Sequence, residues 1–225
     1  MVELLIMDAD ELKDSEKFET AMELVGEQRR NKVERLFKEE SKRLSLAAGL
    51  LLRYAFFSVN QAKLYTEIEV TANGKPYLPN KEYYFSLSHS GRYAICTFSK
   101  VPVGCDIEKT RDKLPRTTKI FSIQEEKEFI TLEEKEKRQI FFQLWTCKES
   151  ITKLIGKGIA YPFESFSVLH ENQVKESVFI DERYFYLKSF HQIENYAISV
   201  CTETSKITWE IKKMNWYNLI KIKNT

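Results

Sequence analysis

Two carboxylates stand two residues apart in the segment VGCDIEK, which has the apolar pattern of a short strand. Because side chains alternate along a strand, Asp106 and Glu108 leave the same face, and Ile107 between them points into the core. Paired hard oxygen ligands on one face suit Mg²⁺ or Mn²⁺. A solvated strand end carries the same D-x-E pattern, so the pair by itself is compatible with a metal site and with an ordinary surface.

A third carboxylate comes from the segment FFQLWTCKESITKLIGKG, which predicts an amphipathic helix. Trp145, Glu149 and Lys153 follow one side of this helix at spacing i, i+4, i+8. As an exposed ion pair, Glu149 and Lys153 would contribute only about 0.2–0.5 kcal/mol. The tryptophan on the same stripe favours a partly buried setting. Glu149 would then complete a Mg²⁺ site that leaves positions for water and phosphate oxygens.

A hydroxyl and an imidazole are neighbours in the segment FSLSHSG. Ser88 and His89 point to opposite faces of a strand, so they cannot form a nucleophile–base pair without a kink. The G-x-S-x-G elbow does not occur in the sequence either. Together with the backbone at Gly91, the two side chains are better suited to donate hydrogen bonds to an anion. A histidine that caps a hairpin is the structural alternative.

Basic residues gather between Arg29 and Arg43, where a solvated helical face is the ordinary interpretation. Arg43 is an exception because it stands in the first turn of an apolar helix, where packing would hold its side chain. Lys75, between Gly74 and Pro76, stands in a rigid turn that suits a ligand-binding lysine. Three carboxylates for a metal, with cations for several negative groups, indicate Mg²⁺-dependent transfer or hydrolysis at a phosphate diester or anhydride. Neither a P-loop nor a Rossmann fingerprint is present.

The elements that must position these residues alternate between helices and strands. Apolar spacing with a period of two predicts strands, and spacing near 3.6 predicts helices. We expect a helical stretch over 15–38 that is broken near Gly26, and helices over 41–59, 125–131 and 136–155. Strands are expected over 2–7, 66–72, 83–88, 92–98, 103–108, 164–169, 174–180, 183–190 and 195–203.

Two strand-like pieces resemble each other, RYAICTFS over 92–99 and NYAISVCTE over 195–203, and each follows a long apolar-rich helix. The repetition predicts an α+β fold of two similar α/β halves related by a pseudo-twofold, each a small sheet packed with a long helix. We expect an N-terminal lobe over 1–103 on the nucleotide side and a C-terminal lobe over 104–225 with the metal and the catalytic helix. The active site is expected at the lobe interface, where ligand clefts commonly form.

The composition is that of an ordinary globular protein of 225 residues, long enough for one domain or two small ones. A net charge of +2 is too near zero to indicate binding to nucleic acid or to a membrane surface. The first residues show no signal peptide, and no segment is long and apolar enough to span a bilayer. Four cysteines without C-x-x-C spacing are expected to be buried thiols. We therefore expect a cytoplasmic protein.

The motifs GKP, FSLSHSG, VGCDIEK, FS…E and LWTCKESITKLIGKG follow one another in the order and spacing of the 4′-phosphopantetheinyl transferases, a family that the chain resembles. The likeness is to the larger, two-lobed type, that of the enzyme activating surfactin synthetase, and runs from about Glu27 into the C-terminal strands. It implies a monomer that binds coenzyme A between its lobes. Such an enzyme moves the phosphopantetheine arm to a serine of an apo acyl or peptidyl carrier protein and releases adenosine 3′,5′-bisphosphate.

The resemblance also implies a role for each matching residue. Asp106, Glu108 and Glu149 would hold Mg²⁺, with Mn²⁺ as the alternative ion. Lys153 would neutralise charge on the leaving phosphate, as cations do in other phosphoryl transfers. Glu149, alone or with Glu125 or a metal-bound water, is the candidate base for the carrier serine. Coenzyme A would be bound by Arg43, Lys75, Ser88, His89, Lys148 and Lys153.

One segment departs from the family pattern. The positions near Gln28 and Asn31 usually carry lysines that reach phosphates of coenzyme A, and here both are neutral. Either a neighbouring cation, Arg29, Arg30 or Lys32, takes over these contacts, or the affinity for the nucleotide is lower.

Two other functions compete with phosphopantetheine transfer. A Mg²⁺-dependent nucleotide pyrophosphohydrolase would usually carry more acidic residues on one helix than the segment from Trp145 to Lys153 does. A non-enzymatic binding module would leave the three carboxylates without a task. The sequence therefore predicts a Mg²⁺-dependent phosphopantetheinyl transferase. It does not distinguish among fatty-acid, polyketide and nonribosomal-peptide carriers, all of which present a serine.

Overall fold

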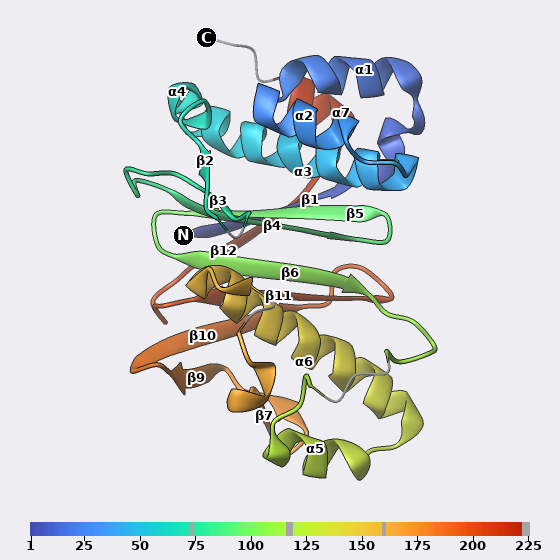
Figure 1. The fold of residues 1–225 in the computed structure, drawn as a ribbon, viewed down its shortest axis with the longest axis vertical. Coiled ribbons are helices and arrows are strands. Elements are labelled where there is room, and N and C mark those ends of the chain that lie inside the picture. The colour runs from blue at the N-terminus through green and yellow to red at the C-terminus, as the bar shows by residue number, and fades with distance from the viewer. Residues whose placement is uncertain (73, 116–118, 159–160, 222–225) are drawn as a thin grey trace. The chain divides into compact units, whose positions relative to one another are not determined.

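The computed structural model describes residues 1–72, 74–115, 119–158 and 161–221, and its ribbon is drawn in Figure 1. The chain divides into two compact units. Unit 1 consists of Met1–Lys100 and Thr208–Thr225, and unit 2 of Val101–Ile207. None of the described helices combines the length and the apolar character that crossing a membrane requires.

Unit 1 is a four-stranded sheet with a long helix packed on it. The strand order is β12-β1-β5-β4, in which β1 is parallel to β12 and antiparallel to β5, and β4 and β5 form a hairpin. Helix α3 packs against β1, β4 and β5. The elements are β1 (Val2–Asp8), η1 (Ala9–Lys13), α1 (Ser15–Leu24), α2 (Glu27–Glu34), α3 (Glu39–Ser58), α4 (Ala62–Tyr65), β2 (Glu69–Val70), β3 (Pro76–Tyr77), β4 (Tyr84–Ser90), β5 (Tyr93–Ser99), β12 (Trp209–Met214) and α7 (Trp216–Ile220).

Helix α3 forms the core of unit 1, as its apolar sequence predicts. Most residues from Leu44 to Phe56 are buried. The ring of Phe56 meets Phe98 of β5 edge-on at 5.1 Å between centroids and Phe85 of β4 at 5.8 Å. Each large side chain buried in this way stabilises the fold by about 1.5–3 kcal/mol. The contact holds the β4–β5 hairpin, which carries two of the predicted site residues, against the helix.

Unit 2 repeats this plan with a four-stranded antiparallel sheet of order β6-β11-β10-β9. Helix α6 packs on β6 and β11. A capping box between Glu133 and Glu136 begins the helix, and Gly156 ends it in the left-handed region with a φ of 87°. The elements are β6 (Val103–Lys109), α5 (Ile123–Ile130), α6 (Glu134–Ile155), η3 (Phe163–Ser165), β7 (Leu169–His170), β8 (Gln173–Val174), β9 (Ser177–Ile180), β10 (Arg183–Phe190) and β11 (Tyr196–Thr202).

The two units share a topology, which confirms the prediction of an α+β fold made of two small sheets, each packed with a long helix. Within unit 1, the strand order β1-β5-β4 matches the order β6-β11-β10 within unit 2. The similar pieces RYAICTFS and NYAISVCTE form β5 and β11, which are inner strands covered by α3 and α6 respectively. The sequence repetition therefore corresponds to equivalent strands.

The C-terminal segment does not follow the predicted division of the chain at residue 103, which assigned it to the second lobe. Residues 208–225 belong to unit 1 rather than to the second half of the chain. Strand β12, which the apolar pattern does not predict, pairs in parallel with β1 from Val2 opposite Trp209 to Met7 opposite Met214. This pairing joins residues at opposite ends of the sequence, so local spacing carries no signal of it.

Three expected strands differ from their patterns. The strand expected over 174–180 is divided between the end of β8 and β9. Residues 66–72 contain only the two-residue strand β2, and residues 164–169 contain part of η3 and the start of β7. In residues 164–169 the backbone has other partners, because the carbonyl of Phe166 accepts from a lysine and the N–H of Val168 donates to a carboxylate. Buried backbone groups must be paired, and here side chains replace a neighbouring strand. The break near Gly26 is confirmed, between α1 and α2.

Candidate active site

Strand β6 presents its two carboxylates on the face that α6 covers. A Cβ built on Gly104 would overlap the carbonyl oxygen of Ser150 and lie 2.8 Å from the backbone nitrogen of Leu154, so Gly104 faces the helix. Asp106 and Glu108 follow at spacing two and leave the same face. The missing side chain at Gly104 lets the helix approach the strand closely. This close approach brings residues of α6 to the two carboxylates.

Helix α6 contributes an acid and a cation to this face. The Nζ of Lys153 donates to Oδ1 of Asp106 at 2.6 Å. The Asp106 side chain is only 5% exposed, whereas that of Lys153 is 26% exposed and reaches solvent. Glu149, one turn before Lys153, is buried. At the other end of this stripe, Trp145 packs against Phe141 and Phe163, with ring centroids 6.2 and 6.0 Å away.

The electrostatics of this cluster are dominated by an excess of negative charge. Burial, together with the charges of Asp106 and Glu108, raises the pKa of Glu149 to about 7, although Lys153 opposes the rise. Burial disfavours the ammonium of Lys153, but the carboxylate of Asp106 outweighs this effect and raises the pKa of Lys153. Lys153 therefore faces the carboxylates of Asp106 and Glu149, and the charge of Glu108 acts on Glu149 as well. Binding of a further cation would reduce the repulsion among these carboxylates and stabilise the cluster.

The donor set has the chemistry of a site for a hard divalent ion, which prefers carboxylate oxygens. No group of three or more metal-ligating side chains is assembled at coordinating distance among the residues that the structure describes. Lys153 Nζ lies at one oxygen of Asp106. An ion at this place would have to compete with that ammonium, so the metal-ligand roles of Asp106, Glu108 and Glu149 stay predictions.

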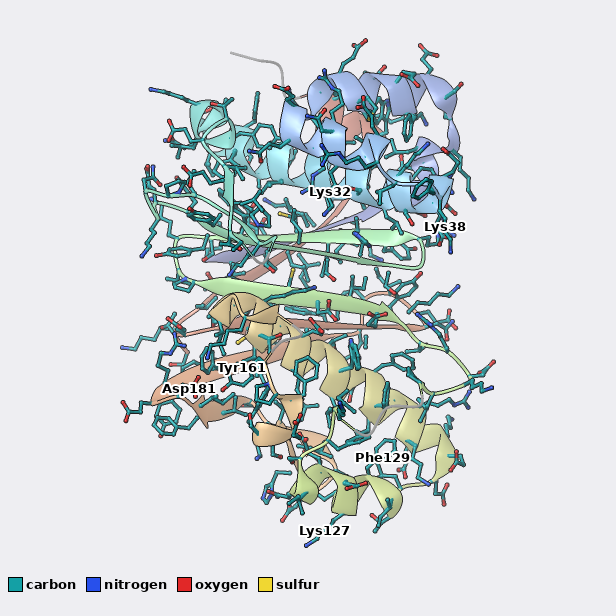
Figure 2. The ribbon with its side chains drawn as sticks, in the orientation of Figure 1. Lys32, Lys38, Lys127, Phe129, Tyr161 and Asp181 are labelled. Atoms are coloured by element: carbon teal, nitrogen blue, oxygen red, sulfur yellow. The ribbon has the colours of Figure 1, made fainter. Side chains whose placement is uncertain are left out.

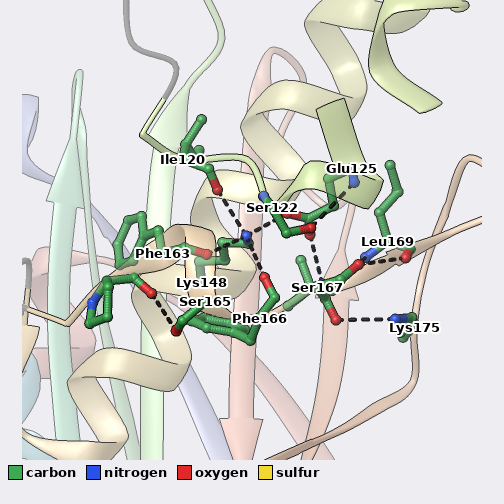
Figure 3. A network of polar contacts seen from close by, with 12 residues as sticks. Ile120, Ser122, Glu125, Lys148, Phe163, Ser165, Phe166, Ser167, Leu169 and Lys175 are labelled. Atoms are coloured by element: carbon green, nitrogen blue, oxygen red, sulfur yellow. Dashed lines mark hydrogen bonds and ion pairs between the residues drawn. The ribbon is translucent and has the colours of Figure 1, made fainter. Parts of the chain in front are cut away.

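Lys148 and Glu125 are placed differently from the ligand-binding and catalytic roles that the motifs imply. Both side chains are fully buried, and Nζ of Lys148 lies 2.5 Å from Oε2 of Glu125 (Figure 3). Burial lowers the pKa of Lys148, and the Glu125 carboxylate partly offsets this. Neither group is open to a ligand. A sequence signal for Glu125 exists, because S-x-x-E over 122–125 is a capping box, and the structure contains that box at the start of α5.

The four remaining predicted residues lie on three segments of unit 1. Arg43 is half-buried on α3, and Lys75 is half-buried just before β3. The backbone N–H of Thr71 donates to the carbonyl of Lys75, and the N–H of Lys75 donates to Oγ1 of Thr71. Partial burial lowers the pKa of Lys75. On β4, Ser88 is buried and His89 exposed, which confirms that the neighbours point to opposite faces. The binding roles of the four residues stay predictions.

Helix α2 contains Gln28 and Asn31, the two neutral positions at which the sequence differs from the family pattern, and it shows which neighbouring cation is available to a ligand. Gln28, Asn31 and Lys32 are exposed and share one face at spacing i, i+3, i+4 (Lys32 is labelled in Figure 2). Arg29 instead turns toward α3, where Nη1 donates to Oγ of Ser45 at 3.4 Å.

Arg30 is also committed to the protein, because its Nε donates to the carbonyl of Met22 at 3.0 Å. Of the three neighbouring cations, Lys32 is therefore the one whose position matches that of the two neutral residues. Although the side chain is exposed, desolvation by the neighbouring protein and the charge of Arg29 lower the pKa of Lys32.

All four cysteines are buried thiols outside any disulfide, as the sequence predicts. Burial raises the pKa of the Cys147 thiol to about 11 and raises that of Cys201 well above its ordinary value. The neutral thiol is a poor nucleophile and metal ligand, so Cys147 and Cys201 act as packing residues.

Comparisons with known proteins cover almost the whole chain. The model of the 4′-phosphopantetheinyl transferase superfamily matches residues 102–201, and the model of the 4′-phosphopantetheinyl transferase N-terminal region matches residues 13–100. The first range contains Asp106, Glu108, Glu149 and Lys153, and the second contains the four site residues predicted in unit 1.

Several curated proteins are similar over most of their length. The 4′-phosphopantetheinyl transferase Sfp of Bacillus subtilis (strain 168) is 30% identical over 210 residues, which is 91% of this chain and 94% of Sfp. The 4′-phosphopantetheinyl transferase gsp of Aneurinibacillus migulanus is 30% identical over 223 residues, 92% of this chain and 89% of the relative. The 4′-phosphopantetheinyl transferase AcpT of Escherichia coli (strain K12) is 29% identical over 143 residues, 61% of this chain and 67% of AcpT.

Proposed function

This chain belongs to the 4′-phosphopantetheinyl transferase family, and from that premise we propose that it moves the phosphopantetheine arm of coenzyme A to a serine of an apo acyl or peptidyl carrier protein. The family makes the chain a transferase of the phosphopantetheine group. The donor, the acceptor and the second product, adenosine 3′,5′-bisphosphate, belong to the proposal.

The observation that carries this proposal is the contact of Lys153 Nζ with Asp106 Oδ1 beside the buried carboxylate of Glu149. These three residues come from the two segments that hold the motifs V-G-x-D-I-E and W-x-x-K-E-S-x-x-K. The ammonium of Lys153, held at a cluster of carboxylates, can also contact the oxygens of a pyrophosphate. A divalent ion that arrives with the pyrophosphate would then neutralise the carboxylates. The arrangement therefore supports chemistry at a pyrophosphate.

In the proposed reaction, Oγ of the carrier serine attacks the β-phosphorus of coenzyme A and forms a new O–P bond. The bond from that phosphorus to the bridging oxygen breaks, and its electron pair leaves with adenosine 3′,5′-bisphosphate. Lys153 donates to the oxygen on which this charge develops. We assign the serine proton to Glu149 rather than to Glu125, because Glu125 is enclosed by its own hydrogen bonds.

Asp106, Glu108 and Glu149 are the residues we propose to hold Mg²⁺. When bound, this ion supplies Lewis-acid polarisation of the pyrophosphate oxygens. Mn²⁺ accepts the same oxygen ligands and is the alternative. For the nucleotide part of coenzyme A we propose Arg43, Lys75, Ser88 and His89, which offer cationic, hydroxyl and imidazole donors from unit 1.

Intact-protein mass spectrometry tests the proposal directly. An apo carrier protein is incubated with this enzyme, coenzyme A and Mg²⁺, and a parallel sample contains EDTA. We expect the carrier to gain the mass of one phosphopantetheine, and we expect EDTA to prevent the gain. Fatty-acid, polyketide and peptide carriers should be compared in the same way.

Two other outcomes would contradict the proposal. Cleavage of coenzyme A without a mass gain on any carrier would indicate a pyrophosphohydrolase. If coenzyme A is not cleaved and no carrier gains mass, the protein would be a binding protein without this activity. Replacement of Asp106 by asparagine would then leave its function unchanged.

Replacement of Lys32 by alanine should weaken the binding of coenzyme A more than it slows transfer. Lys32 lies on the exposed face of α2 that also carries Gln28 and Asn31, so it is the cation placed to reach a phosphate there. Loss of one charged hydrogen bond should raise the KM for coenzyme A about tenfold, with kcat within about twofold. Steady-state kinetics with a fixed carrier concentration measure both constants.

The matched control for this prediction is Lys127→Ala, which removes an exposed lysine from α5 in unit 2 (Figure 2). Its KM for coenzyme A should stay at the wild-type value. An unchanged KM in Lys32→Ala as well would mean that the segment binds no phosphate, and that the neutral positions lower the affinity instead.

A further inference from the structure

The ammonium of Lys148 lies in a cage of acceptors drawn from several segments of unit 2. Its Nζ is 2.8 Å from the carbonyl oxygen of Ile120, 2.7 Å from that of Phe163 and 2.8 Å from that of Phe166. The fourth acceptor is Oε2 of Glu125 at 2.5 Å. A lysine ammonium has three protons to donate, so the four acceptors within hydrogen-bonding distance satisfy it fully.

Glu125 completes the cage and ties in further backbone. Its Oε2 also accepts from the N–H of Ser122 at 2.8 Å, and its Oε1 accepts from the N–H of Val168 at 2.7 Å. Figure 3 shows the carboxylate and the ammonium as the centre from which these bonds radiate. The pair thereby joins α6 to the start of α5 and to the segment 163–168.

This cage lies on the opposite side of α6 from β6. Residues advance by about 100° around a helix, so Lys148 lies about 200° from Ser150, the residue whose carbonyl abuts Gly104. The helix is thus held from two sides, by the strand at Gly104 and by the cage at Lys148. Glu149, the next residue, and Lys153 project between these two supports. A rotation of α6 that moved either side chain would pull Nζ out of its acceptors.

We propose that Lys148 and Glu125 are positioning residues, whose buried contact sets the rotation of α6 and so the places of Glu149 and Lys153. This inference rests on the proposed function, because those two side chains are the ones assigned to the transfer. Neither Lys148 nor Glu125 touches the substrate in this scheme. Their replacement should lower kcat and the affinity for a divalent ion, and it should leave the KM for coenzyme A nearly unchanged.

Glu125→Gln is the first test variant, because it removes the charge and keeps the lysine with its three carbonyls. Lys148→Met is the second, because it keeps the length of the side chain and removes the ammonium. Val178→Ala, a buried position on β9, is the control for lost stability in the same unit. All proteins are assayed at about 10 °C, and circular dichroism there and in a thermal scan reports the folded fraction. Mn²⁺ binding is titrated by calorimetry without substrate.

We expect folded Glu125→Gln to lose about 10²-fold in kcat, as small misplacements of reacting groups do, with a KM for coenzyme A within about twofold. Its Mn²⁺ affinity should fall as well. Val178→Ala should have a lower Tm and wild-type values of kcat and Mn²⁺ affinity. Lys148→Met should behave as Glu125→Gln does if it folds.

Wild-type kcat and Mn²⁺ affinity in folded Glu125→Gln would overturn the inference, since the pair would then serve stability alone. Failure of both variants to fold at 10 °C would overturn it for the same reason. A wild-type protein that neither transfers nor binds Mn²⁺ would overturn the proposed function, and this inference with it. Transfer by the wild type with undiminished transfer by the variants would overturn only the inference.

Discussion

Replacement of Glu149 by glutamine should lower kcat by at least about 10²-fold and, in the absence of metal, stabilise the protein at pH 8. The first effect follows from the loss of the proposed base and metal ligand. The second follows from the environment of the carboxylate, because burial and the charges of Asp106 and Glu108 raise its pKa to about 7. A neutral amide of nearly the same shape removes the repulsion.

The sign of the pH dependence follows from the direction of this shift. A carboxyl whose pKa is raised on folding holds its proton better in the folded state than in the unfolded chain. Its favourable contribution is complete below the unfolded pKa and disappears as the pH rises through about 7. The stabilisation by Glu149→Gln should therefore be about 2 kcal/mol at pH 8 and should shrink toward pH 5.

Thermal unfolding at pH 5 and pH 8, with and without Mg²⁺, measures this effect. Mg²⁺ should raise the Tm of the wild type at pH 8 by mass action and should change the Tm of Glu149→Gln much less. Glu126→Gln, at an exposed position of α5, is the matched control and should behave as the wild type. A lower Tm of Glu149→Gln at pH 8 would contradict the repulsion that we describe.

Gly104→Ala should remove both stability and activity. The new methyl group would overlap the carbonyl oxygen of Ser150 and lie 2.8 Å from the nitrogen of Leu154, and both atoms belong to the backbone of α6. No side-chain rotation relieves such a contact, so the helix must move away from β6. Overpacking of this kind costs about 1–3 kcal/mol, and a displaced Glu149 and Lys153 should lower kcat about 10²-fold.

Urea unfolding and steady-state kinetics measure the two losses. Gly26→Ala is the matched control, because a Cβ there would meet only Cε1 of Tyr65 at 3.7 Å, an ordinary contact. Its stability should change by less than about 1 kcal/mol, and its kcat should stay at the wild-type level. Wild-type stability and kcat in Gly104→Ala would mean that α6 does not depend on close contact with β6.

Several features of the site follow from local sequence alone. The alternation of a strand places Asp106 and Glu108 on one face, and the same rule separates Ser88 from His89. Helical spacing places Glu149 and Lys153 on one stripe of α6. The break at Gly26 and the length of the apolar helix α3 were also predicted from local sequence. These features depend on the geometry of one element, and the residues within that element specify it.

Only the tertiary structure decided which side of each helix or strand is covered and which residues cover it. Lys148 stands in the motif W-x-x-K-E-S-x-x-K, yet its Nζ is buried among carbonyls of residues 120, 163 and 166. The segment 164–169 alternates like a strand, yet its backbone is paired with Lys148 and Glu125. Strand β12 pairs with β1 across nearly the whole length of the chain.

The physical reason is the same in each case. Periodicity states which residues share a face, whereas the partner of that face comes from contacts between residues far apart in the sequence. A lysine on a helix has the same local pattern whether it meets a phosphate or three carbonyl oxygens. The sequence by itself determined most of the elements, the two-part α+β plan and the carboxylate–lysine set. Tertiary packing decided the pairing of β12 and the burial of Lys148 and Glu125 inside unit 2.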